Sequence, residues 1–128
     1  MKILFAAPDR DLLECYGQLL EDDLGKTVTA FDGTQVLSLL SDGDFDILIL
    51  DKKIPRAAHK TIIERANAKG VPVVLLTDEA AAARRADDLS PNVRLSYPFT
   101  FAKIKKTVLD TLDGLMINER KGALSGDE

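Results

Sequence analysis

Three polar side chains follow short apolar runs of the sequence. Asp51 and Thr77 each come directly after a run of four apolar residues, and Asp9 follows another such run after two intervening residues. Carboxylate and hydroxyl oxygens gathered in one cleft can hold a hard cation and an anionic oxygen. We therefore ask which elements would bring these three residues together.

Short apolar runs recur at regular spacing and predict five strands, at 3–6, 27–30, 47–50, 73–76 and 93–95. The middle runs show little alternation, as is typical of strands that are covered on both faces. Amphipathic segments lie between the runs. They predict five helices. The first begins near residue 10, and the others lie around 36–40, around 62–66, at 79–87 and at about 100–116.

This order predicts an α/β protein with a flavodoxin-like, doubly wound sheet. Right-handed crossovers favour five parallel strands in the order 2-1-3-4-5 between helical layers, a (βα)5 three-layer sandwich. Ligand sites of such sheets lie beyond the carboxyl ends of the strands. Asp9, Asp51 and Thr77 are expected to converge there, beside the end of the fifth strand at 96–98.

Composition narrows the class of protein. The 128 residues carry a net charge of −4, which argues against a dedicated nucleic-acid module, and no apolar run is long enough to span a bilayer. The single cysteine, Cys15, excludes an intramolecular disulfide and is expected to be buried. No signal-peptide pattern follows Met1, so we expect a cytoplasmic protein. We expect one domain over 1–117, and a polar tail or linker stub over 118–128.

The sequence from Met1 to about Met116 resembles the receiver domains of response regulators. The resemblance rests on Phe45–Asp51 with Pro55 four residues later, on Leu75–Thr77, and on the Tyr97–Phe99 turn. It implies a phosphorylatable aspartate, a divalent metal, and a conformational switch that partner proteins read.

The resemblance assigns roles to the three polar residues. Asp51 matches the phosphoacceptor, and Thr77 matches the hydroxyl residue that binds the phosphoryl group. Asp9 matches a position where an acidic residue sometimes helps to hold magnesium. Asp9 and Asp51 would then form a weak magnesium site, or a site that has been lost. Asp9 has an equally good alternative role as the N-cap of the first helix.

Several positions depart from the receiver pattern. Ala7 and Pro8 stand where receivers have an acidic pair, and Tyr97 stands where they have a lysine. Arg94 replaces the aromatic switch residue, and Asp78 replaces a small residue, with helix capping as the favoured role for Asp78. Phosphoryl transfer depends on positive charge around the equatorial oxygens, so these changes predict damaged chemistry, that is, a pseudo-receiver.

Lys53 is predicted to compensate for the loss of the metal site. Its ammonium group is predicted to fold toward Asp51 and Asp9 and to take the place of the missing metal.

The leading functional prediction is a receiver-like, non-enzymatic module of a two-component phosphorelay that works through protein contacts. Its partners would be a histidine kinase or a downstream signalling protein, with no membrane and no direct nucleic-acid binding. Arg84, Arg85 and Arg94 form a candidate partner face, and the fourth and fifth helices a candidate homodimer surface. One alternative is a working atypical receiver that is phosphorylated on Asp51. Another is a flavodoxin-like cofactor binder or enzyme, which the glycine-free turn at 6–10 disfavours.

Overall fold

The computed structural model describes the backbone of residues 1–77, 93–96 and 100–123, and the side chains of 1–77, 95 and 100–113. Five parallel strands form one sheet in the order β2-β1-β3-β4-β5. Their bounds are β1 Lys2–Ala6, β2 Lys26–Ala30, β3 Ile47–Asp51, β4 Val73–Thr77 and β5 Val93–Ser96. The five predicted strands and the predicted strand order are therefore confirmed.

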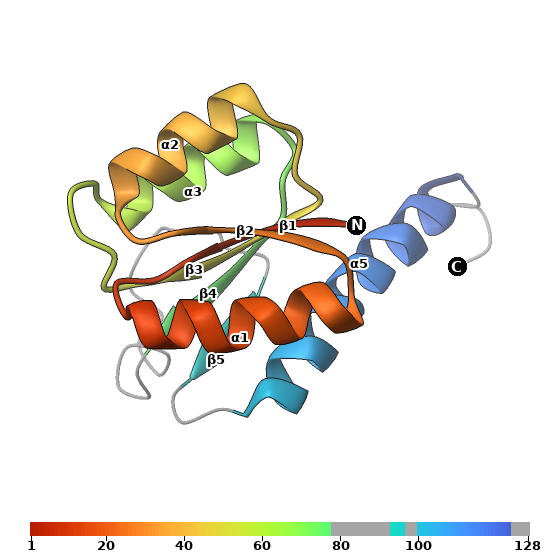
Figure 1. The fold of residues 1–128 in the computed structure, drawn as a ribbon. Helices are drawn as coiled ribbons and strands as arrows, with labels where there is room; N and C mark the ends of the chain where they lie inside the picture. Colours follow the sequence, from red (N-terminus) through yellow and green to blue (C-terminus); the bar gives the residue numbers. More distant parts are fainter. Residues whose placement is uncertain (78–92, 97–99, 124–128) are drawn as a thin grey trace.

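Helices cover both faces of this sheet (Figure 1). Their bounds are α1 Arg10–Asp23, α2 Gly33–Asp42, α3 His59–Ala68 and α5 Phe101–Ala123. α2 and α3 lie on one face, and α1 and α5 lie on the other. The arrangement is the predicted three-layer sandwich. The helix predicted over 79–87 lies outside the described residues.

The sheet divides the core into two clusters because successive side chains of a strand point to opposite faces. Leu4, Leu48 and Leu75 pack under α2 and α3, whereas Phe5, Ile49 and Leu76 pack under α1 and α5. β3 and β4 are buried at every position. This two-sided burial explains why their sequences show no polar alternation.

Polar groups fix the ends of α2. The Asp32 carboxylate accepts a hydrogen bond from Gln35 N at 2.8 Å and caps the N-terminus. At the other end, the ammonium group of Lys69 donates to Leu40 O, and also to Gly43 O at 3.4 Å. Lys69 comes from the end of α3, so it ties the two helices on this face together.

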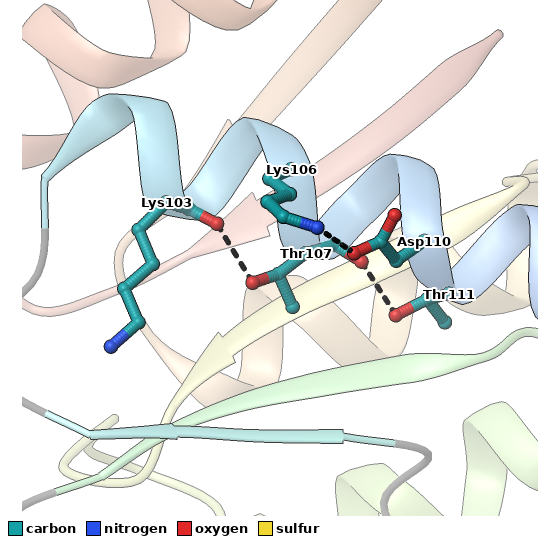
Figure 2. A network of polar contacts seen from close by, with 5 residues as sticks. All are labelled: Lys103, Lys106, Thr107, Asp110 and Thr111. Atoms are coloured by element: carbon teal, nitrogen blue, oxygen red, sulfur yellow. Dashed lines mark hydrogen bonds and ion pairs between the residues drawn. The ribbon is translucent and has the colours of Figure 1, made fainter.

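α5 carries a polar network on part of its surface, which Figure 2 shows. The hydroxyl groups of Thr107 and Thr111 each donate to the carbonyl oxygen four residues earlier, both at 2.7 Å. Lys106 Nζ lies 2.8 Å from Asp110 Oδ2. The hydrogen bond with Asp110, together with its negative charge, raises the pKa of Lys106 above its usual value.

The structure corrects two predictions about helices. α5 continues to Ala123 and does not end near Met116. No proline interrupts 117–123, and Glu119, Arg120 and Lys121 are good helix formers. Cys15 is exposed and not buried, because it falls on the solvent face of α1, beside Glu14.

Candidate functional site

Asp51 is the last residue of β3 and is only 4% exposed. Its Oδ1 accepts a hydrogen bond from Lys53 N at 2.8 Å, and its carbonyl oxygen accepts one from Ile54 N at 3.1 Å. An aspartate that bonds the peptide nitrogen two residues later forms an Asx turn. The turn fixes the carboxylate at the carboxyl end of the central strand.

Thr77 is the last residue of the neighbouring strand β4 and is 2% exposed. Asp51 pairs in register with Leu76, and Lys52 N donates to Leu76 O at 2.9 Å, so Thr77 stands beside the start of the Asp51 turn. Among the described residues, its Oγ1 has no hydrogen-bond partner. A buried hydroxyl without a partner is costly, and such groups often mark a functional site.

Ala7 and Pro8 follow β1, the strand on the other side of β3. Ala6 pairs with Leu50, so the register continues with Ala7 next to Asp51. Ala7 is fully buried and contributes only a methyl group, and Pro8 is exposed. Position 7, just after β1, therefore places no carboxylate next to Asp51.

Asp9 caps α1, as the alternative interpretation predicts. Its Oδ1 accepts hydrogen bonds from Asp11 N at 2.9 Å and from Leu12 N at 3.2 Å. Its backbone is extended, as an N-cap requires. The carboxylate thus has a structural role that accounts for its position without a metal.

The receiver resemblance implies magnesium, and the described donors fit it poorly. One oxygen of Asp51 and one of Asp9 already accept backbone hydrogen bonds. Ala7 supplies no oxygen from its side chain. Within the described part of the chain, no group of three or more potential metal-binding side chains lies together. Magnesium needs near-octahedral oxygen geometry and is usually held by one or two carboxylates together with several waters, so Asp51 and Asp9 could offer it at most one free carboxylate oxygen each.

The predicted contact of the Lys53 ammonium group is absent. The side chain of Lys53 is exposed, and over residues 1–77 no ion pair joins it to Asp51 or Asp9. The Asx turn explains the difference, because it presents the peptide nitrogen of Lys53 to the carboxylate in place of the ammonium group.

The segment after Asp51 packs on the N-terminus of α2, a contact that was not predicted from the sequence. Gly33 N donates to Pro55 O at 2.7 Å, and Arg56 Nε lies 3.9 Å from the Asp32 carboxylate. A Cβ at Gly33 would lie only 2.4 Å from Ala57 Cβ, so the approach requires glycine. A glycine at the first position of a helix was the available signal.

The remaining predicted site residues are not placed by the structure. Asp78, Tyr97, Arg84 and Arg85 lie outside the described residues. Arg94 belongs to β5 and pairs in register with Leu75, and only its backbone is described. Among the described residues, no helix is long and apolar enough to cross a membrane.

Comparison with known sequences gives partial matches to transcriptional regulatory proteins. No family model matches the chain. The transcriptional regulatory protein CpxR of Klebsiella pneumoniae is 33% identical over 98 residues, which cover 70% of this chain and 42% of that protein. The transcriptional regulatory protein DltR of Streptococcus agalactiae is 24% identical over 103 residues, or 77% of this chain and 46% of that protein. The chain thus spans less than half the length of these relatives.

Comparison with solved structures gives matches over nearly the whole chain. The receiver domain of the Francisella response regulator 1452 superposes with a TM-score of 0.78 at 20% identity, and the match covers 89% of this chain and 98% of that one. The chemotaxis response regulator CheY4 of Vibrio cholerae gives 0.76 at 20% identity, covering 86% and 97%. A structure of adenylate cyclase from Rhodopirellula baltica gives 0.80 at 19% identity, covering 99% and 98%.

The sheet order, the position of Asp51 and Thr77 at adjacent strand ends, and these superpositions agree. They confirm the resemblance that the sequence shows: the chain has the receiver-domain fold of response regulators.

Proposed function

We propose that this chain is a receiver-like signalling module that acts through protein–protein contacts, with impaired or absent phosphorylation of Asp51. The observation that carries the proposal is the composition of the site. Asp51 and Thr77 stand at adjacent strand ends, but Ala7 presents a methyl group and Asp9 is engaged in capping α1. The fold of the site is retained while much of its electrostatic machinery is missing.

The physical reason lies in the charge of phosphoryl transfer. The attacking carboxylate and the phosphoryl group are both anionic, so the reaction needs cations to stabilise the equatorial oxygens. Receivers are expected to supply a magnesium ion and a lysine. Here the described carboxylates fit magnesium poorly, and the sequence places Tyr97 at the lysine position.

The second candidate is a working atypical receiver that is phosphorylated on Asp51 and binds magnesium weakly. The buried hydroxyl of Thr77 favours it, since Oγ1 has no hydrogen-bond partner among the described residues and could donate to a phosphoryl oxygen. For this candidate, the Thr77 hydroxyl forms its hydrogen bond only after Asp51 is phosphorylated.

The proposed partners are proteins of two-component signalling, either a histidine kinase or a downstream signalling protein. We place the module in the cytoplasm and assign it no enzymatic activity. The basic residues Arg84, Arg85 and Arg94 remain the proposed face for an acidic partner. Pairing through the fourth and fifth helices remains a proposal as well.

Intact mass spectrometry after incubation with acetyl phosphate and magnesium distinguishes the two candidates. We expect no phosphoryl adduct on the wild type, while an unrelated conventional receiver in the same tube is labelled. An adduct on the wild type that is absent from Asp51→Asn would overturn the proposal and establish the atypical receiver. An adduct that persists in Asp51→Asn would point to a different acceptor.

A further inference from the structure

The outer edge of the sheet is formed by β2, which pairs with β1 on one side only. In a parallel strand the N–H and C=O groups of alternate residues point to opposite sides. Ala30 O accepts a hydrogen bond from Ala7 N at 3.1 Å, so Ala30 faces the interior of the sheet. By this alternation, Thr27, Thr29 and Phe31 direct their backbone groups outward.

The outward N–H groups at the two ends of this row already have side-chain partners. Thr27 N donates to Glu21 Oε1 at 3.2 Å, and Phe31 N donates to Gln35 Oε1 at 3.0 Å. Glu21 comes from α1 and Gln35 from α2, the helices before and after the strand. The N–H of Thr29 lies between them.

This edge is accessible and has a sequence that favours strand pairing. A groove of about 370 Å³ runs between α1 and the strand, and Glu21, Thr27, Thr29 and Phe31 are among its lining residues. Lys26–Ala30 is rich in β-branched residues, which pair readily in sheets. An exposed edge of this kind is a template for another strand unless the protein blocks it.

We propose that Glu21 and Gln35 are edge guards that prevent a second copy of this chain from pairing through β2. Two copies related by a twofold axis would meet as antiparallel strands centred on Thr29. That register places Thr27 of one copy opposite Phe31 of the other, and these are the two residues whose N–H groups the guards occupy. Pairing therefore has to break both side-chain bonds in each copy.

Sedimentation equilibrium of the double variant Glu21→Ala, Gln35→Ala tests the proposal. We expect its self-association constant to be at least about tenfold larger than that of the wild type, equivalent to about 1.4 kcal/mol. Glu14→Ala is the matched control, because Glu14 is a carboxylate of the same groove that forms no hydrogen bond to the described residues of β2. It should associate no more than the wild type.

A folded double variant that associates no more than the wild type would contradict the proposal. Equal association of Glu14→Ala would also contradict it, since loss of charge alone would then explain the effect. Amide hydrogen exchange covers the case in which the double variant does not fold. In the single variant Glu21→Ala, the amide hydrogen of Thr27 should exchange faster, while that of Ala30 is unchanged. Equal exchange rates at Thr27 in the variant and the wild type would contradict the proposed role of Glu21.

Discussion

Thr77 and Thr111 are buried threonines that differ in the bonding of their hydroxyl groups. Thr111 Oγ1 donates to Thr107 O, whereas Thr77 Oγ1 has no partner among the described residues. A buried polar group without a partner costs about 1–3 kcal/mol. We therefore expect Thr77→Val to raise the free energy of unfolding by about 1 kcal/mol, and Thr111→Val to leave it unchanged or lower it.

Urea denaturation of both variants measures this difference. The two substitutions replace a hydroxyl by a methyl group of similar size, so packing changes largely cancel in the comparison. A loss of stability in Thr77→Val equal to that in Thr111→Val would show that the Thr77 hydroxyl is satisfied in solution. A gain of stability in Thr77→Val would support a site in which the Thr77 hydroxyl lacks a partner until an anionic ligand binds.

At the residue scale, the sequence predicted positions better than contacts. The positions of Asp51 and Thr77 followed from apolar runs that end in a polar residue, because all parallel strands end at the same edge of a sheet. The prediction that the Lys53 ammonium group contacts Asp51 and Asp9 was wrong. A long side chain has many rotamers, whereas the peptide nitrogen of Lys53 is fixed by the turn. The capping alternative for Asp9 was right because it needs only local geometry.

At the scale of elements, Gly33 and Ala57 join the N-terminus of α2 to the segment that follows Asp51. A Cβ at position 33 would lie 2.4 Å from Ala57 Cβ and 3.0 Å from Ala57 N. We expect Gly33→Ala to lower the free energy of unfolding by about 1–3 kcal/mol, as overpacking does. Adding Ala57→Gly removes the nearest clash and should restore part of the loss.

A double-mutant cycle with circular dichroism and urea isolates this contact, since it subtracts the separate effects of each substitution. A coupling energy of about 0.5 kcal/mol or more supports the predicted contact. Additive effects of the two substitutions would show that the segment after Asp51 does not rest on α2 in solution.

The elements themselves were largely predictable, and their ends were less so. Buried strands appear in the sequence as apolar runs, and β3 and β4 match their predicted runs to within one residue. The end of α5 was missed because 117–123 carries no strong stop signal, and polarity alone does not end a helix. The docking of Pro55 and Arg56 on α2 is a contact between distant segments, and the glycine at the start of α2 signals a close approach without identifying the segment that makes it.

At the scale of the whole molecule, stability depends on the two clusters that the sheet separates. α5 contributes to the second cluster through Ile104 and Val108, which are fully buried, and Leu112 packs against it. These residues lie in the first half of the helix. In Figure 1 the later turns of α5 extend away from the sheet.

This division predicts that residues 118–128 are dispensable for folding, in keeping with a domain over 1–117. A chain that ends at residue 117 should unfold with a free energy within about 0.5 kcal/mol of the full chain, because the side chains of α5 that the structure places in the core all come before residue 113. A chain that ends at residue 107 loses Val108 and Leu112 and should be destabilised by several kcal/mol, since large buried side chains cost about 2–5 kcal/mol each. Urea denaturation of the three chains measures both effects. A loss above about 1 kcal/mol in the chain that ends at 117 would contradict this prediction and show that residues 118–128 contribute to the stability of the domain.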